Sequence, residues 1–183
     1  MHFWAHLRTI TRHRRLVRHY CFRLGLCWQG LTHDLSKFSP TEFWRGCKYY
    51  QGYRSPNDQE RFETGISRAW LHHKGRNLHH FEYWLDYRPQ GDGTIHIGGG
   101  KMPKKFVAEM FCDRIAACRV YQGEKYTDAS PYEYYDRARQ RKIGDLIHPE
   151  TDALLGRWLL LFKEQGEKAA CRQIREELRD PNY

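Results

Sequence analysis

The sequence predicts an all-α fold, built as a single domain over residues 1–183 with one glycine-rich loop or short hairpin near residues 89–100. Apolar residues recur at spacings of three and four along several stretches, helix-capping residues precede one of them, and glycine gathers in one segment. With 40% hydrophobic and 29% charged residues, the composition is that of a globular domain. A chain of 183 residues is long enough to bury one core.

The N-terminal part begins with two predicted helices between His6 and about Leu31. Apolar residues from Leu16 to Leu24 keep helical spacing, and Gly25 separates the two helices. A further helix is predicted to begin with Ser39 as its cap, Pro40 in its first position and Glu42 completing a capping box. The His33-Asp34 pair therefore stands near a helix end.

The central part is predicted to contain a helix through Phe62 and His73. Ile66, Trp70 and His73 share one face of that helix, so His73 is expected to point toward the core. The run Lys74–Asn77 interrupts it, and Leu78–Tyr87 is interpreted as its continuation or as a new helix.

Past the glycine-rich segment Pro89–Gly100, which is expected to form a short hairpin or a lid, the pattern is helical again. A helix after Pro103 carries Asp113 on its apolar side, where a carboxylate needs a partner. Tyr126–Arg139 is interpreted as a polar connection. The last two predicted helices cover residues 152–163 and 167–178.

Location and partners follow from the composition. No apolar run approaches the length that spans a bilayer, and the N-terminus lacks the features of a secretion signal, so a cytoplasmic protein without membrane contact is expected. The six cysteines form no CxxC pair, and most of them are predicted to be buried thiols. A formal charge of +9, partly concentrated in five arginines between Arg8 and Arg18, favours anionic partners.

Histidine supplies the clearest chemical signal. Seven of the eleven histidines lie in the segments described above: His13, His19, His33, His72, His73, His79 and His80. Neutral imidazole together with carboxylate suits a divalent transition metal such as Fe, Mn, Zn, Ni or Co. The pattern therefore predicts a centre of one or two such ions.

The order His, His-Asp, His, His, Asp on successive predicted helices resembles the HD-domain superfamily of metal-dependent phosphohydrolases. The resemblance runs from His13 to Asp113 and includes HDLSKF, which is similar to the HD-x-x-K form of the superfamily motif. More narrowly, HDLSKFSPTEF, AWLHHKGRNLHHFEYW and EMFCDRIAA resemble an uncharacterised bacterial and phage family, domain of unknown function 5662, over nearly the full length. An HD-like helical bundle is the fold that this resemblance implies.

The resemblance also implies the metal ligands, which are His13, His33, Asp34 and Asp113, with Asp34 as the bridge if two ions bind. The extra ligands of a dinuclear centre would be His73 and His80, with His72 and His79 as alternatives, because adjacent histidines cannot be distinguished by sequence. The interval from His13 to His33 is shorter than is usual in the superfamily, which leaves His19 as a less favoured substitute for His13.

Hydrolysis of a phosphate ester would also need cations and proton-transfer groups around the metal. The expected phosphate-binding residues are Lys37, Arg76, Lys104, Lys105 and Arg114. The expected catalytic residues are Lys37, Arg76, Glu82 and Glu109, where the two glutamates either transfer protons or anchor ligand histidines.

The leading functional hypothesis is a metal-dependent hydrolase that attacks a phosphate ester, such as a nucleotide, with metal-activated water. The first alternative is an HD-type diiron oxygenase, since some members of the superfamily use the six-ligand form for oxygen chemistry. The second is a non-catalytic basic helical protein that binds nucleic acid and holds a structural metal. An anionic small molecule is the favoured partner and nucleic acid the less favoured one, while the oligomeric state is left open.

Overall fold

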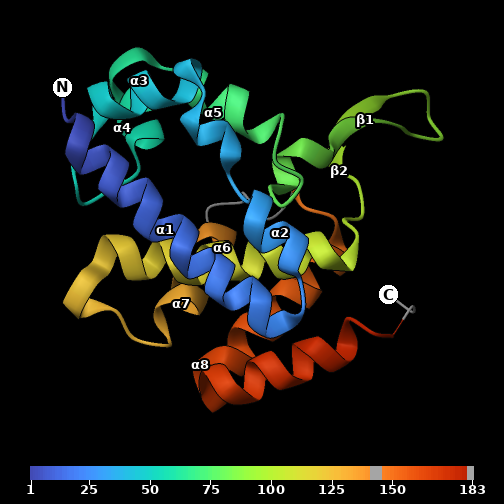
Figure 1. Cartoon of the computed structure of the whole chain (residues 1–183). Coiled ribbons are helices and arrows are strands. Elements are labelled where there is room, and N and C mark those ends of the chain that lie inside the picture. Colours follow the sequence, from blue (N-terminus) through green and yellow to red (C-terminus); the bar gives the residue numbers. More distant parts are fainter. Residues whose placement is uncertain (141–145, 181–183) are drawn as a thin grey trace.

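Residues 1–140 and 146–180 are described by a computed structural model, which is mainly helical with one two-stranded sheet (Figure 1). The α-helices are α1 (Phe3–Leu24), α2 (Cys27–Thr32), α3 (Pro40–Tyr49), α4 (Pro56–Thr64), α5 (Arg68–Lys74), α6 (Lys104–Gln122), α7 (Ser130–Gln140) and α8 (Pro149–Glu177). Short 3-10 turns are η1 (Leu35–Phe38), η2 (Phe81–Trp84) and η3 (Gly123–Lys125), and the strands are β1 (Leu85–Pro89) and β2 (Ile95–Gly99). The predicted helical class is confirmed.

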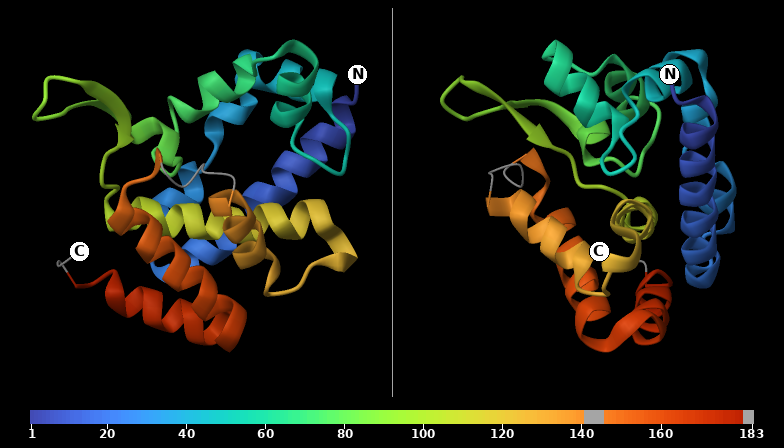
Figure 2. Two further views of the ribbon diagram at one scale, coloured as in Figure 1. Left: turned by 180° about the vertical axis from the view of Figure 1, so that it is seen from behind. Right: turned by 90° about the vertical axis from the view of Figure 1, so that its left-hand side faces the viewer.

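Helix α6 lies at the centre of the molecule. Seen along its axis, it has α1 on one side and α7 with α8 on the other, while α3, α4 and α5 gather near the N-terminal end of α1 (Figure 2, right). Its buried face packs Phe111 edge-to-face against Trp158 and Phe162 of α8. Helix α6 therefore contacts α1 on one side and α7 and α8 on the other, which fixes its position.

The predicted break between the first two helices is confirmed at Gly25, which closes α1 in the left-handed conformation with φ of 81°. A side chain is disfavoured at such a backbone angle, and glycine has none. The start of α3 is also as predicted, with Pro40 in the first turn and the Ser39 hydroxyl accepting from the Glu42 amide. The capping box is incomplete, however, because the Glu42 carboxylate contacts two histidines instead.

The single helix expected through Phe62 and His73 is two helices. Gly65 ends α4 with φ of 77°, and the Ser67 hydroxyl caps α5 by accepting from the Trp70 amide. Ile66, placed on the core face by its spacing, is half exposed in the turn between the two helices. The apolar periodicity continues through a break that the glycine and the serine cap impose.

The segment from Leu78 to Tyr87 is not helical, which corrects the sequence prediction. It forms the turn η2 and then β1, which pairs antiparallel with β2 from Leu85 opposite Gly99 to Pro89 opposite Ile95. The expectation of a short hairpin in the glycine-rich segment is confirmed, and the hairpin projects from the helical body (Figure 2, left). Gly99 lies where an added Cβ would strike the backbone of Leu146, so only glycine fits there.

The connection expected between Tyr126 and Arg139 contains helix α7. Its residues are mostly polar, and it is anchored by the buried Tyr135, whose hydroxyl donates to the Asp152 carboxylate. The two C-terminal helices were predicted as separate units. Both lie within the range of α8, and the break between them is confirmed at Gly166, where the backbone is non-helical with φ of 75° and ψ of 177°.

Within residues 1–140 and 146–180, no helix combines the length and the apolar character that a bilayer crossing requires.

Candidate metal centre

The backbone turn at Asp34 brings two neighbouring side chains into one place. Asp34 has a φ of 54°, and it is the one residue other than glycine with a positive φ in the described part of the chain. Aspartate tolerates this left-handed conformation better than most residues. The Arg14 side chain of α1 holds the preceding segment by donating to the carbonyls of His33, at 2.8 Å, and Leu31, at 3.0 Å. The turn is thereby fixed to the helix that carries His13.

The first group of possible metal-binding side chains consists of His13, His33, Asp34 and Asp113, whose ligand atoms lie within 4.8 Å of one another. The Nε2 atom of His13 is 3.0 Å from Asp113 Oδ1, and the Nε2 atom of His33 is 3.2 Å from Asp34 Oδ2. All are buried except Asp113, whose side chain is 18% exposed. These are the four residues that the superfamily resemblance selected.

The second group consists of Asp34, His73, His79 and His80. The Nε2 atoms of His73 and His79 lie 3.3 Å and 3.5 Å from Asp34 Oδ1. Asp34 therefore turns Oδ2 toward the first group and Oδ1 toward the second. A carboxylate in this position can bridge two ions.

Three buried atoms in the second group lack a hydrogen-bond partner among the described residues: Asp34 Oδ1, His79 Nε2 and His80 Nε2. Burying a polar atom without a partner costs about 1–3 kcal/mol, so three such atoms around one point need an explanation. A cation at that point would satisfy all three. The donor chemistry, imidazole nitrogen and carboxylate oxygen, suits a divalent transition ion.

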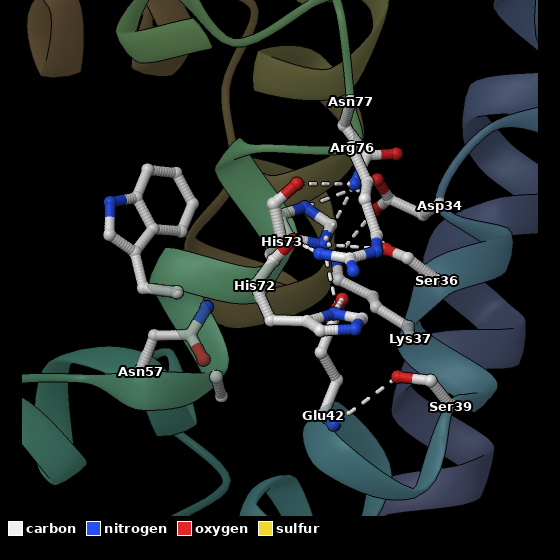
Figure 3. A network of polar contacts seen from close by, with 12 residues as sticks. Asp34, Ser36, Lys37, Ser39, Glu42, Asn57, His72, His73, Arg76 and Asn77 are labelled. Atoms are coloured by element: carbon white, nitrogen blue, oxygen red, sulfur yellow. Dashed lines mark hydrogen bonds and ion pairs between the residues drawn. The ribbon is translucent and has the colours of Figure 1, made fainter.

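Two glutamates contact the Nδ1 atoms of histidines in the two groups and so orient their rings. Glu109 Oε1 lies 2.9 Å from His33 Nδ1 and 3.1 Å from His79 Nδ1, so one carboxylate supports a histidine of each group. Glu42 lies 2.8 Å from His73 Nδ1, and Figure 3 shows Glu42 and Asp34 approaching His73 from different sides. When Nδ1 donates to a carboxylate, Nε2 keeps its lone pair for a metal.

The charged forms of Asp34 and His33 stabilise each other. Burial would raise the pKa of Asp34, but His33 and Lys37 hold it well below its usual range. Burial would lower the pKa of His33, but the charge of Asp34 and hydrogen bonds to Asp113, Asp34 and Glu109 raise it well above its usual range. Burial and the neighbouring His79 and His73 hold the pKa of His80 well below normal, which keeps its imidazole neutral.

Two of the predicted histidine alternatives belong to neither group. The His72 side chain binds Glu42 through Nδ1 at 2.6 Å, and it is a member of neither group. His19 is exposed, with its Nε2 3.6 Å from Glu167. The sequence left open which histidine of each adjacent pair takes part. The structure places His73 of the first pair, and both His79 and His80 of the second pair, in one group.

Of the five predicted phosphate-binding residues, Lys37 forms an ion pair with Asp34, a member of both groups, and its Nζ atom is 2.6 Å from Asp34 Oδ2. Arg76 is exposed and donates to the His72 carbonyl, and Arg114 has a buried Nε without a hydrogen-bond partner in the described residues. Lys104 donates to the carbonyls of Glu177 and Asp180, and Lys105 lies over the Phe106 ring, two helical turns or more from Asp113.

The proton-transfer candidates differ in position. Glu109 contacts the Nδ1 atoms of His33 and His79, as an anchoring residue would. Glu82 is partly buried, and burial raises its pKa, opposed by Arg114. Sequence reasoning missed Glu42 and Arg14. Glu42 was interpreted only as a capping residue, and nothing in the sequence marks Arg14 among the other arginines of α1.

A comparison with protein-family models matches residues 2–160 to a family of unknown function, DUF5662. The chain belongs to this family. No curated protein and no solved structure matches it.

Proposed function

We propose that this DUF5662 protein is a dinuclear metal-dependent hydrolase of phosphate esters with an HD-like helical bundle. The observation that carries the proposal is the double role of Asp34, whose two oxygens face two separate groups of imidazole and carboxylate donors. A purely structural zinc site would more often use cysteine, and no cysteine belongs to either group. The proposed ligands are His13, His33, Asp34 and Asp113 for one ion and Asp34, His73, His79 and His80 for the other.

When bound, divalent ions of this kind lower the pKa of water and polarise a phosphoryl oxygen. Lys37 supplies the positive charge beside them. Burial would lower the pKa of Lys37, but Asp34 and Asp113 raise it, so the ammonium stays charged. A charged amine at this position can hold a phosphate oxygen while the ester is cleaved.

The proton for the leaving group would come from Glu82. Its raised pKa keeps more of the carboxyl protonated near neutral pH than in an exposed glutamate. Arg114, whose charge acts on Glu82, would hold a second phosphate oxygen through its unpartnered Nε. Arg76, which is exposed, is left to contact the part of the substrate nearer the solvent.

The second candidate is an HD-type diiron oxygenase. It is supported by the nitrogen-rich second group, which offers three imidazoles and a carboxylate, a donor set that suits iron. The two candidates separate in one assay. Release of inorganic phosphate from a phosphate ester under nitrogen supports hydrolysis, whereas substrate-dependent oxygen consumption supports the oxygenase.

The metal centre itself is tested by elemental analysis of protein purified without a histidine tag. The wild type is expected to hold one or two equivalents of Fe, Mn, Zn, Ni or Co, and Asp34→Ala is expected to lose them. His72→Ala is the matched control, because it removes an imidazole next to the second group without removing a proposed ligand. Equal metal content in wild type and Asp34→Ala, or a wild type that neither holds nor binds divalent ions, would leave the basic nucleic-acid-binding hypothesis as the better account.

A further inference from the structure

A cleft of about 410 Å³ lies away from the two metal-binding groups, between the C-terminal half of α1, the end of α6 and the middle of α8. These three helices pack against one another in Figure 1. Arg12, Arg15, His19 and Arg119 contribute positive or titratable groups to its wall. We propose that this cleft binds an organic phosphate, at a site separate from the metal centre. This inference does not depend on the proposed function.

The positive charge of the cleft exceeds its negative charge. Among the described residues that line the cleft, Glu167 is the one carboxylate, and it is already matched by an ion pair with Arg23 and by Arg119 at 3.7 Å. Arg12 and Arg15 are exposed, and neither forms a hydrogen bond or ion pair with another residue in the described ranges. The Nε atom of Arg119 is buried and also lacks a hydrogen-bond partner there.

The helical repeat of α1 separates the cleft from the metal centre. Arg12, Arg15 and His19 follow one another at intervals of three and four, so they lie along one face of the helix. His13 is displaced from Arg12 by about 100° around the helix, and it is buried toward Asp113. One helix therefore serves both sites with different faces.

The chemistry of the wall selects the class of ligand. Two unpaired guanidinium groups match a phosphate monoester, which carries a charge of about −1.5 to −2 and accepts paired hydrogen bonds. The volume falls within the range of about 300–1,000 Å³ that is usual for small organic ligands, so the cleft has room for more than the phosphate. Leu16, which is half-buried and lies between the cations, offers an apolar surface for the organic part.

Phenylphosphonate is a suitable probe, because it carries a dianionic head on an apolar ring and has no ester bond to be hydrolysed. Binding would be measured by calorimetry at low ionic strength and mildly alkaline pH, on the full-length protein as purified. The double variant Arg12→Gln/Arg15→Gln is expected to raise the Kd at least about tenfold, which corresponds to about 1.4 kcal/mol. The matched control, Arg8→Gln/Arg18→Gln, removes the same charge from the same helix outside the cleft and is expected to leave the Kd within about twofold.

Two results would overturn the inference. Equal weakening in both double variants would mean that the anion responds only to the overall charge of α1. A wild type without saturable binding at millimolar phenylphosphonate would mean that the cleft holds no organic phosphate. Thermal unfolding of each variant shows whether the exposed substitutions leave the fold intact. Metal content, which tests the proposed function, is measured on separate samples, so either proposal can fail alone.

Discussion

Glu109 is expected to control both proposed metal sites at once. Its Oε1 accepts from His33 in the first group and from His79 in the second, at 2.9 Å and 3.1 Å. Glu109→Gln keeps the shape of the side chain and an acceptor oxygen but removes the negative charge that the two histidines share. Loss of an outer carboxylate of this kind typically weakens metal binding by about 10–100-fold. We expect both ions to be held at least about tenfold more weakly, or by about 1.4 kcal/mol each.

The matched comparison is Glu42→Gln, because Glu42 supports His73 of the second group and no histidine of the first. Competition with a chromogenic chelator, titrated with Zn²⁺ or Mn²⁺, resolves the affinities of the two sites. Glu109→Gln should shift both binding steps, and Glu42→Gln should shift one. The reasoning would be refuted if Glu109→Gln shifted only one step, or neither, while Asp34→Ala abolished binding.

Three further predictions concern stability and the position of the Asp34 turn. Gly46→Ala places a Cβ against the His6 ring, and the overlap should destabilise the protein by about 1–3 kcal/mol in urea unfolding, whereas Gly91→Ala, which meets no atom, should cost far less. Burial lowers the pKa of His6 from 6.5 to about 4, so the unfolded chain binds its proton first and stability falls as the pH drops from 6.5 toward 4. That loss, up to about 3 kcal/mol, should be missing from His6→Leu in unfolding curves measured across this range; an unchanged pH dependence would contradict the assignment. Arg14→Ala removes the donors to the two carbonyls beside the Asp34 turn and should lower both the Tm and the metal content. The exposed Arg18→Ala is the control. An unchanged Tm and metal content in Arg14→Ala would show that the turn holds without this contact.

The parts of the fold that could be predicted from sequence are those set by local chemistry. Gly25 and the Ser39-Pro40 pair end and start helices through backbone angles and hydrogen bonds within a few residues. The break at Gly65 was missed because apolar spacing continues across it. Helix α7 was missed because it buries few side chains, among them Tyr135, and so lacks an apolar period.

The residues of the candidate centre could likewise be predicted only in part from the sequence. The order of the histidines and aspartates predicted which residues lie close together, because that order resembles a known arrangement. Sequence could not separate His72 from His73, since neighbours on a helix differ by about 100° and only the packing of α5 against Glu42 and Asp34 decides which one faces inward. It could not exclude His79 either, because the turn before η2 lets both His79 and His80 face Asp34.

The first group of possible ligands is complete only when α6 is in place, because Asp113 lies on that helix, whereas all members of the second group precede residue 81. A nascent chain that emerges from the ribosome therefore carries the whole second group for some time without Asp113 or Glu109. During that time His79 lacks the Glu109 carboxylate that contacts its Nδ1 atom in the folded protein. Docking of α6 against α1 adds this contact and completes the first group, so the full arrangement forms only after α6 has been synthesised.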